Sequence, residues 1–215
     1  MNGLLYKDLL NLNPTMKYLI VIALIFCVVF IPMGNELPVY IILVMSGATL
    51  PATAISFDAA ARWDKYAVSL PLTRREIVTA RYLLMMGGIC VAGIISLAIT
   101  IAMTVLMPGK GIFLPFIDPL TLMVMFVACG LFLGSIALPL TLKFGAEKMR
   151  YIIMVIALTP VVVMLGMTFL MDLSGTSLAA PVLMPVILGG MLVITAIVVF
   201  VSYRFSVGIY AKKEF

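Results

Sequence analysis

The chain has 215 residues, of which 64% are hydrophobic and 11% are charged, with a net charge of +5 and no His. Soluble domains carry about 25% charged residues, so this composition excludes an ordinary soluble enzyme and a soluble nucleic-acid-binding protein. The length suits membrane spans joined by short connections. We therefore expect one domain, residues 1–215, without a separate soluble catalytic unit.

Residues 1–13 are predicted to form an amphipathic helix that lies flat in the membrane interface. Its leucines recur at helical spacing with polar side chains between them: Leu4, Leu5, Leu9 and Leu12, against Lys7, Asp8 and Asn11. An apolar stripe beside a polar face is typical of an interfacial helix. The Asn13-Pro14 pair is expected to end this helix. The alternative is a frayed terminus.

The rest of the chain contains six windows without Asp, Glu, Lys or Arg that are long enough to cross a bilayer. A helix needs about 20 mostly apolar residues to cross about 30 Å of hydrocarbon. A soluble core has no use for such windows, because its helices keep a wet face. The sequence therefore predicts an all-α membrane protein with six transmembrane helices, at about 17–33, 38–57, 82–107, 119–142, 151–171 and 181–203.

The basic residues indicate the orientation of these spans. Six spans place both termini on the same side, and of the 14 Lys and Arg residues only Lys110 then falls on the other side. Because basic residues are retained on the cytoplasmic side, both termini are predicted to be cytoplasmic. Four tyrosines also mark this boundary, as expected at an interface: Tyr18, Tyr82, Tyr151 and Tyr203.

The chain lacks the side chains of a membrane enzyme. Without His there is no Ser-His or Cys-His pair, and the three Cys residues do not have the spacing of a metal site. No predicted span contains a carboxylate to relay protons, and there is no GxxxxGK(S/T) phosphate loop. We expect no catalytic, metal or cofactor site, so that ATP, if it is used, is bound by another chain.

The connection between the second and third predicted spans divides into two helices. An alanine-rich stretch favours a short helix from Asp58 to Tyr66. Asp58 and Arg62 are four residues apart and are expected to pair on one face of it, while Trp63 and Tyr66 give it an aromatic edge. Such a helix either docks onto a partner protein or dips into lipid headgroups.

The second helix of this connection is predicted to run directly into the third span. Pro71 ends the first helix, and Thr73 with Glu76 has the spacing of a capping box. We therefore expect a new helix to begin at Arg74, followed by Arg75. Arg81 lies seven residues after Arg74 and is expected on the same basic face.

This connection resembles the signature of a known family. The run Trp63-Asp64-Lys65-Tyr66-Ala67, followed by Leu70-Pro71-Leu72-Thr73-Arg74-Arg75, is similar to that of a small family of six-span ABC-2-type permeases, the family of the phenol-soluble modulin exporters. The resemblance implies a permease without its own ATPase. It also implies a second permease subunit, identical or different, and two copies of an ATP-binding cassette protein that binds ATP and Mg²⁺.

The same resemblance assigns roles to residues of the connection. The short helix would be the coupling helix, seated in a groove of the cassette protein, and its partner-binding residues would be Asp58, Arg62, Trp63, Asp64, Lys65 and Tyr66. The basic residues would also meet acidic groups of the cassette or anionic lipid headgroups. Thr73 and Glu76 would cap the next helix, and Arg74, Arg75 and Arg81 would form its basic face.

Gly130 and Gly134 form a GxxxG pair in the fourth predicted span. Small residues let helices approach closely, so this pair is expected to pack within the subunit or at a dimer contact.

These observations together predict the permease subunit of an ATP-driven exporter in a bacterial cytoplasmic membrane. The spans lack charges that would pair with an ionic solute, which favours an amphipathic peptide or a hydrophobic compound as the substrate. We expect the chain to contact membrane lipids and not to bind nucleic acid. Two alternatives remain. The chain is otherwise an ion-driven carrier or channel, or a non-transporting membrane anchor or immunity protein.

Overall fold

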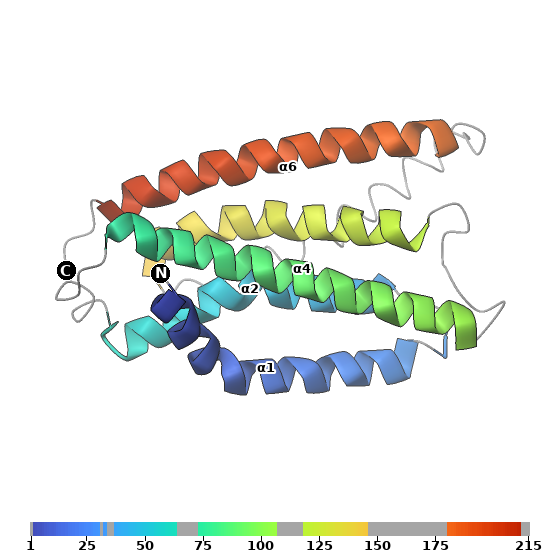
Figure 1. The fold of residues 1–215 in the computed structure, drawn as a ribbon, viewed down its shortest axis with the longest axis horizontal. Coiled ribbons are helices and arrows are strands. Elements are labelled where there is room, and N and C mark those ends of the chain that lie inside the picture. Colours follow the sequence, from blue (N-terminus) through green and yellow to red (C-terminus); the bar gives the residue numbers. More distant parts are fainter. Residues whose placement is uncertain are drawn as a thin grey trace.

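Long apolar helices run side by side in the computed structural model (Figure 1). The structure describes residues 2–30, 32–33, 37–63, 73–106, 118–145 and 180–211. Within these residues, five helices are long and apolar enough to cross a membrane: α1 (Asn2–Phe30), α2 (Leu37–Ala60), α4 (Arg74–Leu106), the helix Pro119–Gly145, and α6 (Ala180–Ala211). This confirms an all-helical membrane protein. The predicted span 151–171 lies outside the described residues.

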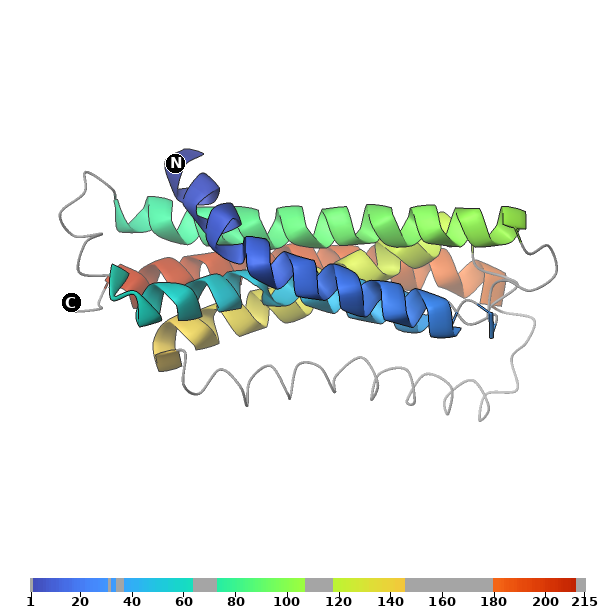
Figure 2. The same cartoon turned by 90° about the horizontal axis from the view of Figure 1, so that it is seen from below.

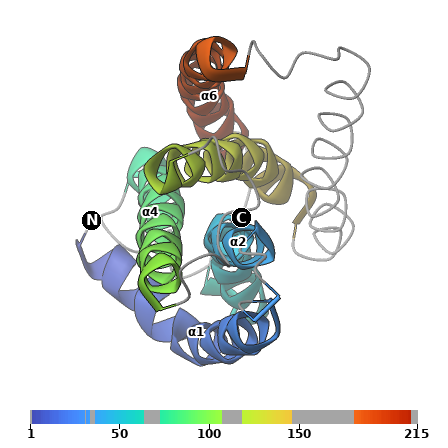
Figure 3. The same cartoon turned by 90° about the vertical axis from the view of Figure 1, so that its right-hand side faces the viewer.

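Of the described helices, α2, α4 and the helix Pro119–Gly145 lie in the middle, and α1 and α6 lie on opposite flanks (Figure 3). Side chains of α2, α4 and the helix Pro119–Gly145 build the main apolar core, in which Val44, Met85, Ile89 and Leu138 are almost completely buried. By contrast, only 11% of the most apolar window of α1 is buried, against 50% for α2. The outer faces of α1 are therefore available to lipid or to another protein.

Among the described helices, α2 and α4 approach each other closely at a pair of glycines. A Cβ added to Gly47 of α2 would lie 2.8 Å from the carbonyl carbon of Gly88 in α4, so the two backbones touch directly. Pro51 lies inside α2 and has no N–H for the carbonyl of Gly47. A Cβ added to Gly88 would lie 3.3 Å from the oxygen of this carbonyl.

The prediction that Asn13-Pro14 ends the first helix is wrong. α1 continues from Asn2 to Phe30 with Pro14 inside it, and its first turns are inclined to the rest of the helix (Figure 2). Proline removes one backbone hydrogen bond and its ring clashes with the preceding turn. A helix tolerates this when it bends, so residues 2–13 form the inclined first turns of α1 and continue into the rest of the helix (Figure 2).

The starts of α1 and α4 and the ends of α2 and α6 lie at one end of the bundle (Figure 1). We call this end, where Asn2 and Ala211 lie, the terminal end. The ion pairs described next lie at this end.

Candidate functional site: a buried ion-pair cluster

Arg81 of α4 lies between two carboxylates from different helices. Its Nη1 atom is 2.7 Å from Oδ2 of Asp8 in α1, and its Nη2 atom bonds Oδ2 of Asp58 in α2. The side chains of Arg81, Asp8 and Asp58 are 3%, 1% and 7% exposed. A planar guanidinium offers donors in a fixed fork, and here the two prongs join α1 and α2 to α4.

Lys7 completes the cluster from its rim. Its Nζ atom is 2.7 Å from Oδ1 of Asp58 and 3.3 Å from Oδ1 of Asp8, and its side chain is 26% exposed. Two cations therefore face two anions, so the group is neutral. An uncompensated buried charge is costly, and this balance makes the burial of Arg81 tolerable.

Trp63 lies against the same cluster. The Nζ atom of Lys7 is 3.7 Å from the centroid of the Trp63 ring, a cation–π distance. Trp63 is half-buried and packs on the main core. A small cavity of about 50 Å³ lies beside it, with Arg81 and Tyr210 in its wall. Trp63, the third residue after the end of α2, is thus in contact with the ion-pair cluster.

The local sequences explain why charges are buried here. Leu4, Asp8 and Leu12 follow one another at intervals of four, and all three are buried, so Asp8 belongs to the inward stripe of α1. Likewise Arg81 lies on the buried face of α4 with Val78 and Met85. The expectation that Asp8 lies on the polar, wet face of the first helix is therefore wrong.

The predicted pairing of Asp58 with Arg62 is also wrong. Asp58 lies in the last turn of α2, which ends at Ala60, and its oxygens are taken by Lys7 and Arg81. Arg62 is exposed and has a φ of 50°, the left-handed conformation that often follows a helix. Asp58 and Trp63 therefore do not share one continuous helix. Asp64, Lys65 and Tyr66 lie outside the described residues.

The predicted capping box is confirmed. The N–H of Thr73 donates to Oε2 of Glu76 at 2.8 Å, and the N–H of Glu76 donates to Oγ1 of Thr73 at 3.3 Å. These reciprocal bonds satisfy two backbone donors that a helix start leaves free. α4 accordingly begins at Arg74.

The capping box supports a first prediction. Thr73→Ala removes the side-chain acceptor of the box and should lower the free energy of unfolding by about 1 kcal/mol. We expect the unfolding midpoint of the detergent-solubilised protein to fall. Thr73→Ser is the comparison, because it keeps a hydroxyl acceptor at the cap and should leave the midpoint nearly unchanged. An unchanged midpoint in Thr73→Ala would show that the box does not hold the start of α4.

The basic residues that follow the cap bind the end of α6. Nη1 of Arg74 donates to the carbonyl oxygens of Tyr210 and Ala211, at 3.1 and 2.7 Å, where helix C-termini leave carbonyls without partners. Nε of Arg75 donates to the hydroxyl of Tyr203 at 3.2 Å. The expected single basic face is thus divided, because Arg74 and Arg75 reach α6 while Arg81 points into the ion-pair cluster.

Residues 3–211 of the chain match the model of a protein family described as "ABC-2 family transporter protein". The chain belongs to this family. It is thus the membrane permease component of an ABC-2-type transporter, and such permeases pair with separate ATPase subunits. The comparisons with curated proteins and with solved structures gave no match.

The GxxxG pair of the permease packs inside the subunit. A Cβ on Gly130 would lie 2.4 Å from Cγ1 of Val44 in α2, and one on Gly134 would lie 2.7 Å from Sδ of Met85 in α4. Of the two expected uses, packing within the subunit or a dimer contact, the structure places this face of the helix against α2 and α4.

Sequence reasoning missed Lys7 and Asp8 as site residues of the permease. The available signal was the spacing of Leu4, Asp8 and Leu12, which places a carboxylate on a leucine stripe. It also missed the polar contact between α4 and α6, where the Tyr82 hydroxyl lies 2.6 Å from Oγ of Ser202 and 2.9 Å from Oγ of Ser206.

The described part of the permease contains no group of three or more His, Cys, Asp or Glu side chains placed to hold a metal ion. What the cluster does chemically is to fix positions. It binds the first turns of α1, the last turn of α2 and the second turn of α4 to one another at the terminal end.

Proposed function

We propose that the permease is the membrane-spanning half of an exporter in a bacterial cytoplasmic membrane, and that its terminal end faces the cytoplasm. Two permease subunits, identical or different, would form the path, each with a cassette protein that binds ATP and Mg²⁺. The distribution of Lys and Arg along the chain supports this orientation. The cassette would bind the connection between α2 and α4.

The observation that carries this proposal is the contact of Trp63 with Lys7 inside the ion-pair cluster. A cassette that moves the connection at Trp63 would act directly on Lys7 and, through Asp58 and Arg81, on three helices at once. Buried ion pairs hold discrete geometries because each alternative leaves a charge unpaired. The cluster is therefore suited to pass a displacement of Trp63 on to α1, α2 and α4, because its paired side chains cannot move independently of one another.

The docking surface itself would consist of Arg62 and Trp63, together with Asp64, Lys65 and Tyr66 from the adjoining stretch. Asp58 is the internal anchor of this surface, since its carboxylate is buried between Lys7 and Arg81. Anionic lipid headgroups would share the exposed basic side chains with the cassette.

We propose an amphipathic peptide or a hydrophobic compound as the exported substrate. The buried charges of the described residues neutralise one another at the terminal end. They leave no buried counter-ion for a strongly ionic solute inside the described bundle. Apolar and aromatic side chains line the remaining helix surfaces.

Reconstitution in vesicles tests the proposal. The permease is incorporated with the cassette protein that co-purifies with it, and uptake of a fluorescent amphipathic helical peptide into inside-out vesicles is followed. We expect uptake only with both proteins and ATP. Uptake by the permease alone without ATP would favour an ion-driven carrier. Full export by cells that lack the permease, together with lost protection, would favour an anchor or immunity protein.

Trp63→Ala provides a second prediction, on the cassette contact. Buried aromatic anchors at interfaces contribute about 2 kcal/mol or more, so we expect at least a tenfold weaker binding of the cassette and loss of peptide-stimulated ATPase activity. Co-purification and binding titrations measure this. Tyr18→Ala is the matched control, because Tyr18 is an aromatic residue of α1 that is 72% exposed. Equal cassette binding by the Trp63 and Tyr18 variants would contradict the assignment.

A further inference from the structure

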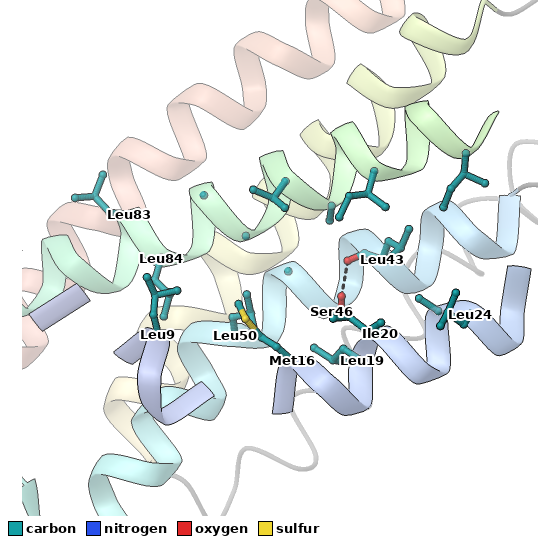
Figure 4. Close-up of a pocket in the computed structure, with 18 of the residues that line it drawn as sticks. Leu9, Met16, Leu19, Ile20, Leu24, Leu43, Ser46, Leu50, Leu83 and Leu84 are labelled. Atoms are coloured by element: carbon teal, nitrogen blue, oxygen red, sulfur yellow. Dashed lines mark hydrogen bonds between the residues drawn. The ribbon is translucent and has the colours of Figure 1, made fainter. Parts of the chain in front are cut away.

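An apolar groove runs along the bundle between α1 and α4, with α2 as its floor (Figure 4). Its volume is about 630 Å³. Leu9 and Leu84 lie near the terminal end of the groove, and Leu24 lies toward the other end (Figure 4). Several residues along its rim, among them Ile20, Leu24 and Val91, are more than half exposed, so the groove opens on the outer surface of the bundle.

Glycine makes the groove deep. The direct contact of Gly47 with Gly88 brings α2 and α4 together, while Gly87, the residue before Gly88 in α4, faces open space. A Cβ on Gly87 would meet no atom within 4 Å. The two neighbouring glycines of α4 therefore have different effects. Gly88 allows α4 to contact α2, and Gly87 leaves the space that forms the groove.

The lining favours hydrocarbon over a polar ligand. The hydroxyl of Ser46, a polar group in the lining, donates to the carbonyl of Leu43 at 2.6 Å (Figure 4). Its hydrogen is thus used within α2, and a polar ligand would lose its bonds to water without replacing them. Along α4 the lining extends from Leu83 to Ile99, which is about 24 Å of helix. This is longer than the ~15 Å depth of one hydrocarbon leaflet.

A cation, Lys17, lies within the stretch of α1 that lines the groove. Lys17, Ile20 and Leu24 are spaced by three and four residues, so they lie on one face of α1, and the latter two line the groove. Lys17 is exposed, and within the described part of the chain it has no ion-pair partner. An anionic headgroup is the complement of a free ammonium beside an apolar groove.

We propose that this groove binds one acyl chain of an anionic phospholipid from the cytoplasmic leaflet, with the headgroup phosphate at Lys17. The assignment of the leaflet rests on the orientation proposed above. The acyl chain fills the hollow at Gly87 and covers the gap between α1 and α4, so that the lipid becomes part of the packing between α1 and the core. This lipid is distinct from bulk lipid, because it is held on three sides by helices.

Retention of lipid by the purified protein tests this site. The permease is purified together with its cassette partner, the detergent is exchanged exhaustively, and the remaining phospholipid is identified and counted by mass spectrometry. We expect about one phospholipid per permease chain, enriched in anionic headgroups. Gly87→Phe should fill the groove and abolish this retention. Gly189→Phe is the matched control, because Gly189 is a glycine of α6 that also faces open space.

Lys17→Gln separates the headgroup contact from the acyl-chain contact. We expect this variant to retain a phospholipid, but its preference for anionic over zwitterionic headgroups should fall about fivefold. This is the effect expected for one Lys near an anionic surface. Equal lipid retention in Gly87→Phe and in Gly189→Phe would overturn the proposal, and so would an unchanged headgroup preference in Lys17→Gln.

The native Cys27 tests the competing occupant, a second copy of the chain. Cys27 lines the groove, so in a variant without Cys90 and Cys129 a groove covered by a second copy would give Cys27–Cys27 disulfides under oxidant in membranes. We expect none, and their formation would refute lipid occupancy. Neither measurement needs ATP or transport, so failure of the proposed export would leave lipid retention intact, and the reverse also holds.

Discussion

Arg81→Met is expected to destabilise the permease by about 3–5 kcal/mol, the cost of breaking a buried ion pair. Met replaces the apolar stem of Arg but has no guanidinium and no charge, so Asp8 and Asp58 would face each other with Lys7 as their remaining cation. Reversible unfolding in mixed micelles with increasing SDS measures the change. Peptide transport by the reconstituted complex should be lost as well, because α1 and α2 are no longer tied to α4.

A second substitution distinguishes the loss of charge balance from a general packing defect. Arg81→Met combined with Asp8→Asn leaves one cation, Lys7, facing one anion, Asp58, and is neutral again. We expect this double variant to be more stable than Arg81→Met alone, which is the strong non-additivity typical of contacting charges. If the two changes instead add, the charges at positions 8 and 81 do not interact in the membrane-embedded protein.

The five spans that the structure describes and the start of α4 could be predicted from sequence, because each depends on local composition or local spacing. A charge-free window is driven into hydrocarbon by its own side chains, and Thr73 caps a helix with a residue three positions away. Neither requires knowledge of a distant partner. The same holds for the GxxxG face, whose small size is evident in sequence although the helices it meets are not.

The ion-pair cluster could not be predicted in this way because its partners are remote. Lys7 bonds a residue 51 positions away, and Arg81 bonds one 73 positions away. From sequence alone, Asp58 has a plausible local partner in Arg62, and the local pairing rule of helices favours it. The tertiary pairing prevails because the buried Arg81 would otherwise carry an uncompensated charge.

The course of α1 past Pro14 illustrates a second reason. The rule that proline ends a helix describes helices in water, where a broken helix loses little. In this protein the turns before Pro14 are held by packing, because Leu4 and Leu12 are buried against the core and tertiary packing supplies most of the stability of a helix. A bent but continuous helix is therefore favoured over two separate helices. The bend in turn places Asp8 where it meets Arg81.

Gly47→Ala is expected to separate α2 from α4 and to lower stability by about 1–3 kcal/mol, the range for overpacked cores. The added methyl would lie 2.8 Å from the carbonyl carbon of Gly88 and 2.9 Å from the nitrogen of Ile89. Both are backbone atoms, so no side chain can rotate to make room. Unfolding in SDS mixed micelles measures the loss, and transport should fall with it.

Gly87→Ala is the matched control for this contact, since the same methyl is added one residue from Gly88 but meets no atom within 4 Å. Alanine is favoured over glycine in a helix by about 1 kcal/mol, so this variant should be as stable as the native permease or slightly more stable. The two substitutions are chemically identical and differ only in what stands opposite the new methyl. Equal stability of both variants would mean that α2 and α4 do not touch at Gly47, and then neither the depth of the groove nor the transmission of motion from the ion-pair cluster along α2 and α4 would have a physical basis.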